Sequence, residues 1–392
     1  MRDGLQVLFS DDSALRRLRA ARVGVCCNHT AVDGALDHLL DRLAAAGVAV
    51  RRVFTPEHGL HATAQDMIAV DGDEAPGAHV VSLYGDDAAS LRPRAELLAD
   101  LDVVLFDIQD IGARYYTYQA TLGYLMEVAA GTGTTVIVLD RPNPIDGLTL
   151  EGNIVHPGYE SFVSAYPLPV RHGMTMGELA VYFRDQLGIA ASIEVVRCEG
   201  WERAWYHDDT GLPWVYPSPN MPTLDTAILY PGMCLIEGTN LSEGRGTTRP
   251  FHLVGAPWLD ARRFLDLCRS GARDADLRGV AFRAATFEPR FQKFAGHPCG
   301  GVEITLVDRH ALDSLLLGLV VIEAALRAAP AHVRWRTETY EFVDSPIAID
   351  LLGGSAELRV GLESRVPPRD LTRAWDGERD AWLPKRAASL LY

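Results

Sequence analysis

The sequence predicts an α/β fold, with a doubly wound, mostly parallel sheet followed by a second, smaller α+β domain. Through the first half of the chain, apolar runs of strand length alternate with amphipathic helical segments, as in a parallel sheet covered on both faces. After about residue 210 the sequence becomes rich in Pro, Asn and Trp, and then in short strands. The 392 residues, 48% of them hydrophobic, suffice for two domains.

The first domain is expected over residues 1–230. Its first strand is the apolar run 22–27, which is followed by an amphipathic helix over 35–46 that Gly47 ends. Further strands are expected at 48–54, 79–83, 102–106, 135–139 and, at an edge, 193–197, with helices over 120–130 and 174–187. No Gly-x-Gly-x-x-Gly follows the first strand, so a dinucleotide fingerprint is missing.

The second domain is expected over residues 231–392. Before it lies the segment 213–231, which we interpret as a long ordered crossing that lines a site. Short strands are predicted over 279–284 and 301–307, and a helix over 312–328.

Composition excludes several classes of function. The net charge of −15 disfavours nucleic acid and anionic membranes as partners. A P-loop is excluded because no Gly-Lys-Ser/Thr occurs, and the two lysines, Lys293 and Lys385, lie in no Schiff-base motif. The six cysteines form no C-x-x-C pair, which argues against a zinc ribbon and a disulfide framework. Without an apolar run of signal or membrane-span length, we expect a soluble, cytoplasmic protein.

Polar clusters follow four of the expected strands. These clusters are Asn28–Thr30, Glu57–Gly59, Asp107–Asp110 and Asp140–Asn143. Each alone is typical of a turn or a helix cap. Because the carboxyl ends of parallel strands share one edge of the sheet, the four together predict a polar cleft there.

The residue types in this cleft favour carbohydrate chemistry. Sugars need many hydrogen-bond partners and an aromatic surface, which Asp, Asn, Gln, Arg and clustered Tyr provide. Glycosidic cleavage needs a carboxylic acid and usually a second carboxylate. Glu57, in Pro56-Glu57-His58-Gly59, is the best acid, and the possible second carboxylates are Asp107, Asp110, Asp140 and Glu243. Asp107 and Asp140 have an equally good structural interpretation, as helix caps or as partners of Arg141 or Arg114.

A metal site is the rival use of the same residues. Glu57, His58 and His61 resemble a ligand cluster, but their spacing gives no helical i, i+4 pair, so we expect no metal. His172 is interpreted equally as a capping residue or a substrate contact, whereas Glu178 is expected to cap a helix.

Six ordered motifs resemble one family of enzymes. They are PEHG, DIQDIGARYYTY, VLDRPNP, HGMTMGELA, PSPNMPTL and EGTNLSEGRGTTRPF. They are similar to the motifs of the exo-β-N-acetylmuramidases of glycoside hydrolase family 171, formerly a domain of unknown function, and the likeness runs from about Gly24 to Tyr392. The resemblance implies a Rossmann-like domain, a smaller C-terminal domain that closes the cleft, and release of N-acetylmuramic acid from the non-reducing end of peptidoglycan fragments.

The resemblance makes Glu57 the catalytic acid, and we expect His58 to orient it or the substrate. Hydroxyl and acetamido groups of a muramic-acid disaccharide or short glycan are expected to meet Asn28, Gln109, Asp110, Asp140, Asn143, His172, Asn220, Asn240 and Glu243. A guanidinium is the natural partner of the lactyl carboxylate, and the candidates are Arg114, Arg141 and Arg245. Tyr115 and Tyr118 are expected to pack on the sugar ring, with Tyr116 turned away if that stretch is extended. No cofactor is expected.

One departure from the family pattern lies beside the expected acid. The family continues PEHG-Leu with Arg-Gly and a later Ala-Gly, whereas this chain has His61-Ala62-Thr63-Ala64-Gln65-Asp66. Substrate preference or the fit of the leaving group could therefore differ. Two alternatives stay open: a metal-assisted amidase or esterase on cell-wall fragments, and a sugar-binding protein without catalysis. The sequence defines neither the second catalytic group nor the oligomeric state.

Overall fold

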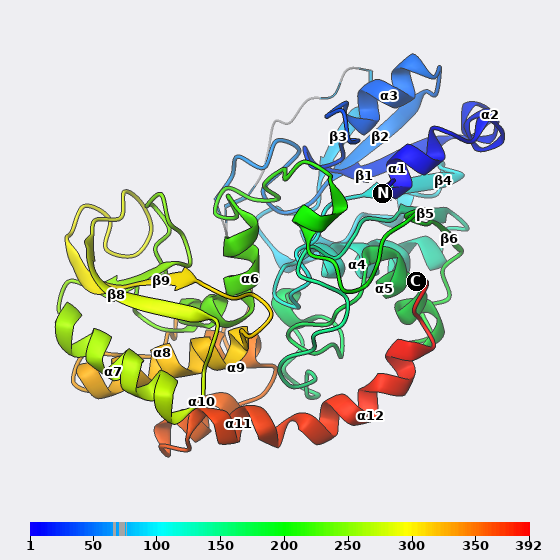
Figure 1. Cartoon of the computed structure of the whole chain (residues 1–392). Helices are drawn as coiled ribbons and strands as arrows, with labels where there is room; N and C mark the ends of the chain where they lie inside the picture. The colour runs from blue at the N-terminus through cyan, green and yellow to red at the C-terminus, as the bar shows by residue number, and fades with distance from the viewer. Residues whose placement is uncertain (66–67, 70–74, 76) are drawn as a thin grey trace.

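A six-stranded parallel sheet forms the first half of the protein (Figure 1). The computed structural model describes the chain except residues 66–67, 70–74 and 76. The strands are β1 (Val23–Cys27), β2 (Val50–Thr55), β3 (His79–Ser82), β4 (Val103–Asp107), β5 (Thr135–Leu139) and β6 (Ile193–Val196), in the order β3-β2-β1-β4-β5-β6. The order reverses between β1 and β4, where ligands bind in many α/β proteins. The predicted fold class is confirmed.

The apolar strands bury both faces of this sheet because successive side chains point to opposite sides. Val25 and Leu105 pack with α1 (Gly4–Leu8), α2 (Asp12–Ala20) and α3 (Leu39–Ala45). Cys26 and Phe106 belong to the core on the other face, with α4 (Tyr118–Ala130) and α5 (Met176–Asp185). The alternation follows from the continuous apolar runs seen in the sequence.

The second half contains an antiparallel sheet in the order β7-β9-β8, formed by β7 (Leu253–Ala256), β8 (Val280–Phe287) and β9 (Cys299–Leu306). Helix α7 (Ala261–Asp274) packs on this sheet, and α8 (Ser314–Ala328) packs against both α7 and α6 (Leu224–Met233). Gly232 of α6 and Gly318 of α8 let these two helices touch, because a Cβ at Gly232 would lie only 1.7 Å from a backbone oxygen of α8.

The chain returns to the first half through four short helices, α9 (Ala348–Gly353), α10 (Glu357–Glu363), α11 (Pro368–Ala374) and α12 (Asp376–Ala387). In Figure 1, α11 and α12 run beneath both halves toward the parallel sheet. Trp382 donates to the Tyr182 hydroxyl at 3.0 Å, and the Tyr392 hydroxyl donates to Asp140 at 2.7 Å. The C-terminal residues are therefore part of the first half's packing.

The structure departs from the sequence prediction in the segment 213–231. Helix α6 begins inside it at Leu224, after Thr223 caps it by accepting from the N–H of Thr226. A proline, Pro231, lies within this helix and hides it from a sequence pattern. All six cysteines are buried and free, in agreement with the expected absence of a disulfide framework. Among the described residues, every helix is too short or too polar to cross a membrane.

Candidate active site

A small cavity, of about 40 Å³, lies where the segments after β2 and β4 meet residues of the second half. Its walls carry three carboxylates, several aromatic rings and few aliphatic groups. The lining residues are Glu57, His58, Tyr115, Tyr116, Thr117, Tyr118, Val163, Ser218, Asn220, Met221, Tyr230, Glu237, Arg245, Phe251, Tyr340 and Glu341. Polar groups converging in a concavity are what a sugar-binding site requires.

Glu57 lies directly after β2, in a turn whose next two residues have left-handed backbone conformations. His58 and Gly59 both adopt left-handed conformations, with φ of 71° and 80°. The turn leaves the Glu57 side chain 5% exposed in the cavity wall, where the Thr117 hydroxyl donates to its Oε2 at 2.6 Å. His58 Nδ1 lies 2.9 Å from the Ala64 carbonyl oxygen, so the imidazole ties the following loop to the turn. Asp66, in the loop that differs from the family pattern, lies outside the described residues.

The tyrosines form a packed group at the start of α4. The rings of Tyr116 and Tyr118 meet edge to face at 5.0 Å, and Tyr116 also meets Tyr230 at 5.7 Å. Because residues 115–117 form a turn instead of an extended strand, Tyr116 faces the cavity together with Tyr115 and Tyr118. Burial raises the pKa of all three phenols, which therefore stay neutral as hydrogen-bonding groups.

Tyr118 also positions a predicted binding residue, Asn28. The Tyr118 hydroxyl donates to the Pro217 carbonyl at 2.6 Å and accepts from Asn28 Nδ2 at 3.1 Å. Asn28 is thereby committed to the protein's own chain, and it does not line the cavity. Asn220 does line the cavity, and its Nδ2 donates at 2.8 Å to Oε1 of Gln65, in the loop that follows Glu57.

Two carboxylates that the sequence analysis did not select come from the second half. Glu237 lies in the last turn of a short 3-10 helix (Cys234–Gly238). The Tyr340 hydroxyl donates to its Oε2 at 2.8 Å, and Arg245 lies 2.7 Å from its Oε1. Glu341 accepts from the Tyr84 hydroxyl at 2.9 Å. Glu237 stood in a quoted motif, so its signal was present, whereas Glu341 has no sequence signal beyond being acidic.

Arg245 is the predicted arginine that reaches this cavity. Its Nη1 lies 2.7 Å from Glu237 and 3.1 Å from Glu243, so one guanidinium spans two buried carboxylates. Lys293 approaches Glu243 from the other side at 3.0 Å. Burial alone would raise the pKa of Glu243, but the Lys293 and Arg245 cations hold that pKa well below its usual value. Glu243 thus acts as a fixed anion behind the cavity wall.

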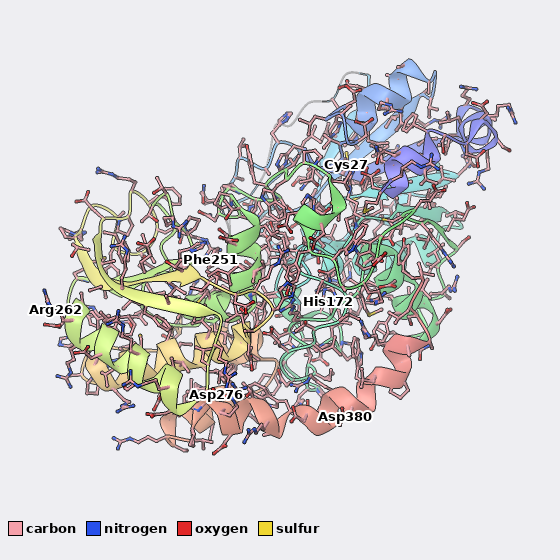
Figure 2. All side chains as sticks on the ribbon, in the orientation of Figure 1. Cys27, His172, Phe251, Arg262, Asp276 and Asp380 are labelled. Carbon is pink, nitrogen blue, oxygen red and sulfur yellow. The ribbon has the colours of Figure 1, made fainter. Side chains whose placement is uncertain are left out.

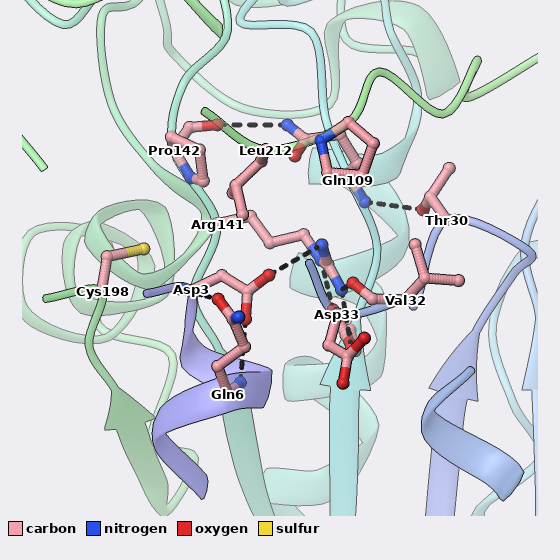
Figure 3. Close-up of polar contacts among 12 residues, drawn as sticks. Asp3, Gln6, Thr30, Val32, Asp33, Gln109, Arg141, Pro142, Cys198 and Leu212 are labelled. Carbon is pink, nitrogen blue, oxygen red and sulfur yellow. Dashed lines mark hydrogen bonds and ion pairs between the residues drawn. The ribbon is translucent and has the colours of Figure 1, made fainter. Parts of the chain in front are cut away.

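Arg141 lies in a different polar cluster at the same edge of the sheet (Figure 3). Its Nε and Nη2 contact the two oxygens of Asp107 at 2.5 and 3.1 Å, and its Nη1 lies 3.5 Å from Asp3. Gln109 donates to the Asp110 and Pro142 carbonyls nearby. A separate hollow adjoins this cluster and includes none of the residues around Glu57.

Other predicted contacts serve the fold. Arg114 is fully buried and donates to the carbonyls of Asn153, Leu168 and Leu352, and burial lowers its pKa to about 10. Asn143 and Asp140 bind backbone groups near the start of α5.

The remaining predicted contacts also lie away from the cavity. His172 is buried in the first half (Figure 2), accepts from the Met174 N–H at 3.2 Å and lies 3.7 Å from Asp110. Glu178 forms the expected capping box with Thr175. Asn240 bonds to the backbone of His332 and Arg334 and does not line the cavity.

Comparisons with known proteins agree on one family. Models described as exo-beta-N-acetylmuramidase NamZ, N-terminal and C-terminal, match residues 23–225 and 228–392. The chain belongs to the exo-β-N-acetylmuramidase NamZ family. This confirms the resemblance found in the sequence and identifies the chain as a glycoside hydrolase.

Individual relatives extend over the whole chain. A peptidoglycan beta-N-acetylmuramidase NamZ of Bacillus subtilis (strain 168) is 38% identical over 392 residues, which are 99% of this chain and 91% of the relative. Two crystal structures of DUF1343 family proteins from Bacteroides fragilis NCTC 9343 superpose with TM-scores of 0.86 and 0.76 at 32% and 26% identity. Each covers 100% of this chain and 98% of the other. These two proteins thus share the two-part fold of this chain.

Proposed function

We propose that this protein releases N-acetylmuramic acid from the non-reducing end of peptidoglycan fragments, in the cavity that contains Glu57. The observation that carries the proposal is a buried glutamic acid, hydrogen-bonded by Thr117, in a polar and aromatic cavity of a NamZ family chain. The relative from Bacillus subtilis is named as a peptidoglycan beta-N-acetylmuramidase. We further propose that the reaction belongs to the recycling of cell-wall fragments.

Glu57 is the general acid in this proposal. Its carboxylic proton passes to the glycosidic oxygen as the bond to the anomeric carbon breaks, and the leaving sugar departs as an alcohol. Water then supplies the hydroxyl that the anomeric carbon carries in free N-acetylmuramic acid, and its remaining proton returns to the Glu57 carboxylate. The Thr117 hydroxyl fixes Oε2 and leaves Oε1 to face the substrate. The tyrosine rings provide the apolar surface against which the sugar ring packs.

Glu237 and Glu341 are the candidates for the second carboxylate, since both line the cavity with Glu57. Glu237 is fixed by Arg245 and Tyr340, an arrangement that favours its ionised form opposite a developing oxocarbenium charge. Glu341 comes from a left-handed turn, with φ of 47°, and contacts Tyr84 of the first half. Arg245 is the arginine we assign to the lactyl carboxylate, because it lines the cavity with Glu57 whereas Arg114 and Arg141 do not.

The test is hydrolysis of para-nitrophenyl β-N-acetylmuramic acid and its N-acetylglucosamine analogue by the wild type and Glu57→Gln. We expect release from the muramic substrate alone. On a natural muramic disaccharide, whose leaving group needs an acid, Glu57→Gln should lower kcat by about 10²–10⁴-fold. Glu338→Gln, which removes an exposed carboxylate outside the cavity, is the matched control. Full activity of Glu57→Gln on the disaccharide would exclude Glu57 as the acid.

A further inference from the structure

We propose that His156, Glu357 and Glu378 form a binding site for a divalent transition-metal ion, for which Zn²⁺ is the natural probe. Their ligand atoms lie within 4.8 Å of one another, and they are the group of three in the described part of the chain that could hold an ion. None of the three lines the cavity with Glu57. This site is therefore separate from the glycosidase chemistry, and its test does not depend on that activity.

The three groups come from three segments that the fold brings together. His156 lies in the first half, in the loop after β5, and its backbone N–H donates to the Gly354 carbonyl at 2.8 Å. Glu357 begins α10, and Glu378 lies in the first turn of α12. An ion at this point would join the first half of the protein to two helices of the second.

Neighbouring donors orient both carboxylates. The N–H of Ile154 donates to Glu378 Oε2 at 3.1 Å, which leaves Oε1 turned toward His156 Nε2 at 2.9 Å. The Trp375 indole donates to Glu357 Oε2 at 3.2 Å. Hydrogen bonds that hold ligand side chains in place are a common feature of metal sites, because they reduce the cost of ordering the ligands.

The exposure and the donor set define the kind of ion. The His156 and Glu378 side chains are each 32% exposed, so an ion can enter and water can complete its coordination. One imidazole and two carboxylates suit Zn²⁺, which accepts three protein ligands and a water molecule. The competing state is a simple hydrogen bond between His156 and Glu378, whose proton the ion must displace.

Calorimetric titration of the metal-free protein with Zn²⁺ tests the site. We expect one saturable site in the wild type, and binding at least about 10-fold weaker in His156→Ala and in Glu357→Gln. Glu357 is exposed, so Glu357→Gln tests the site without loss of folding. His297→Ala, which removes an exposed imidazole elsewhere, should bind Zn²⁺ as the wild type does.

Thermal unfolding provides the second readout, because an ion that binds only the folded protein raises Tm. Saturating Zn²⁺ should raise the Tm of the wild type and of His297→Ala by several degrees, and raise that of Glu357→Gln less. Absence of a saturable site in the wild type, or equal zinc affinity in the wild type and Glu357→Gln, would overturn the proposal.

Discussion

Two polar clusters lie at the same edge of the parallel sheet, one around Arg141 and one around Glu57, yet they have different consequences. In the Arg141 cluster, the cation contacts Asp107 and Asp3. In the Glu57 cavity, three carboxylates from both halves of the protein line one small cavity. The charge of Arg141 is thus paired within its own cluster, whereas the carboxylates around Glu57 are gathered at a shared cavity wall.

The comparison shows how burial separates structural from functional charges. Removing a charge from water is costly unless a partner and hydrogen bonds replace the water. Asp107 is fully buried, and Arg141 provides both its charged partner and its hydrogen bonds. Glu57 accepts from the Thr117 hydroxyl, and its carboxylate lies at the cavity wall. Acidic residues at equivalent strand ends thus have different roles, and the groups that surround each carboxylate decide which role it has.

The largest expected effect on stability comes from breaking the Arg141 cluster. Arg141→Met leaves Asp107 and Asp3 buried without the Arg141 cation, and should lower the free energy of unfolding by about 3–5 kcal/mol. Chemical denaturation measures the loss. Arg16→Met, at an exposed position, is the control and should change little. A loss as small as that of the control would contradict the structural role assigned to Arg141.

Asp140 should make stability depend on pH. Burial raises its pKa from 3.8 to about 6, against hydrogen bonds from Gly177, Thr175 and Tyr392. The folded protein therefore holds a proton that the unfolded chain releases between these values. The resulting stabilisation is fully present below pH 4 and is lost as pH rises through 6, by up to about 3 kcal/mol.

Denaturation of the wild type and Asp140→Asn between pH 4 and 7 isolates this contribution, because the amide does not titrate. The stability of the wild type should fall relative to the variant as pH rises. A constant difference across the range would show that Asp140 keeps an ordinary pKa.

Thr117→Val tests the role of the Glu57 cavity in the comparison. Loss of the hydroxyl removes the 2.6 Å hydrogen bond to Glu57, which should lower kcat on the disaccharide about 10-fold, while KM changes little. Thr117→Ser keeps the donor and should restore most of kcat. If the serine variant is as slow as the valine variant, packing of the methyl group matters instead of the hydrogen bond.

The smallest effect is expected at Asn240, a predicted substrate contact that lies outside the cavity. Asn240→Ala removes hydrogen bonds to the backbone of His332 and Arg334 and should cost about 1 kcal/mol of stability. Its kcat and KM should match the wild type. A raised KM at unchanged stability would show that Asn240 contacts the substrate after all.

Much of the first half was predictable because its signals are local. Continuous apolar runs such as Val104–Phe106 can only be buried strands, and a parallel sheet then gathers their polar ends at one edge. This logic located Glu57. It left open whether Asp107 would serve the site or pair with an arginine such as Arg141, since that depends on side-chain direction across neighbouring strands.

The rest of the site depends on contacts between distant segments. Glu237 and Glu341 approach Glu57 only because the second half folds against the first, a relation that no local pattern encodes. Helix α6 escaped prediction because Pro231 lies within it and its buried surface lacks a polar face. The tyrosine turn before α4 was similarly invisible, since aromatic residues at 115, 116 and 118 fit a strand or a turn equally well.

The chain crosses between the two halves twice, through the segment before α6 and through the helices that end in α12. Further contacts join the halves away from these crossings. Arg114 donates to the Leu352 carbonyl, the Leu315 N–H donates to Glu151, and the Tyr84 hydroxyl donates to Glu341. Because Glu57 belongs to one half and Glu237 to the other, the distance between these two carboxylates is set by the packing of one half on the other, and a substitution at a contact far from the cavity can change it.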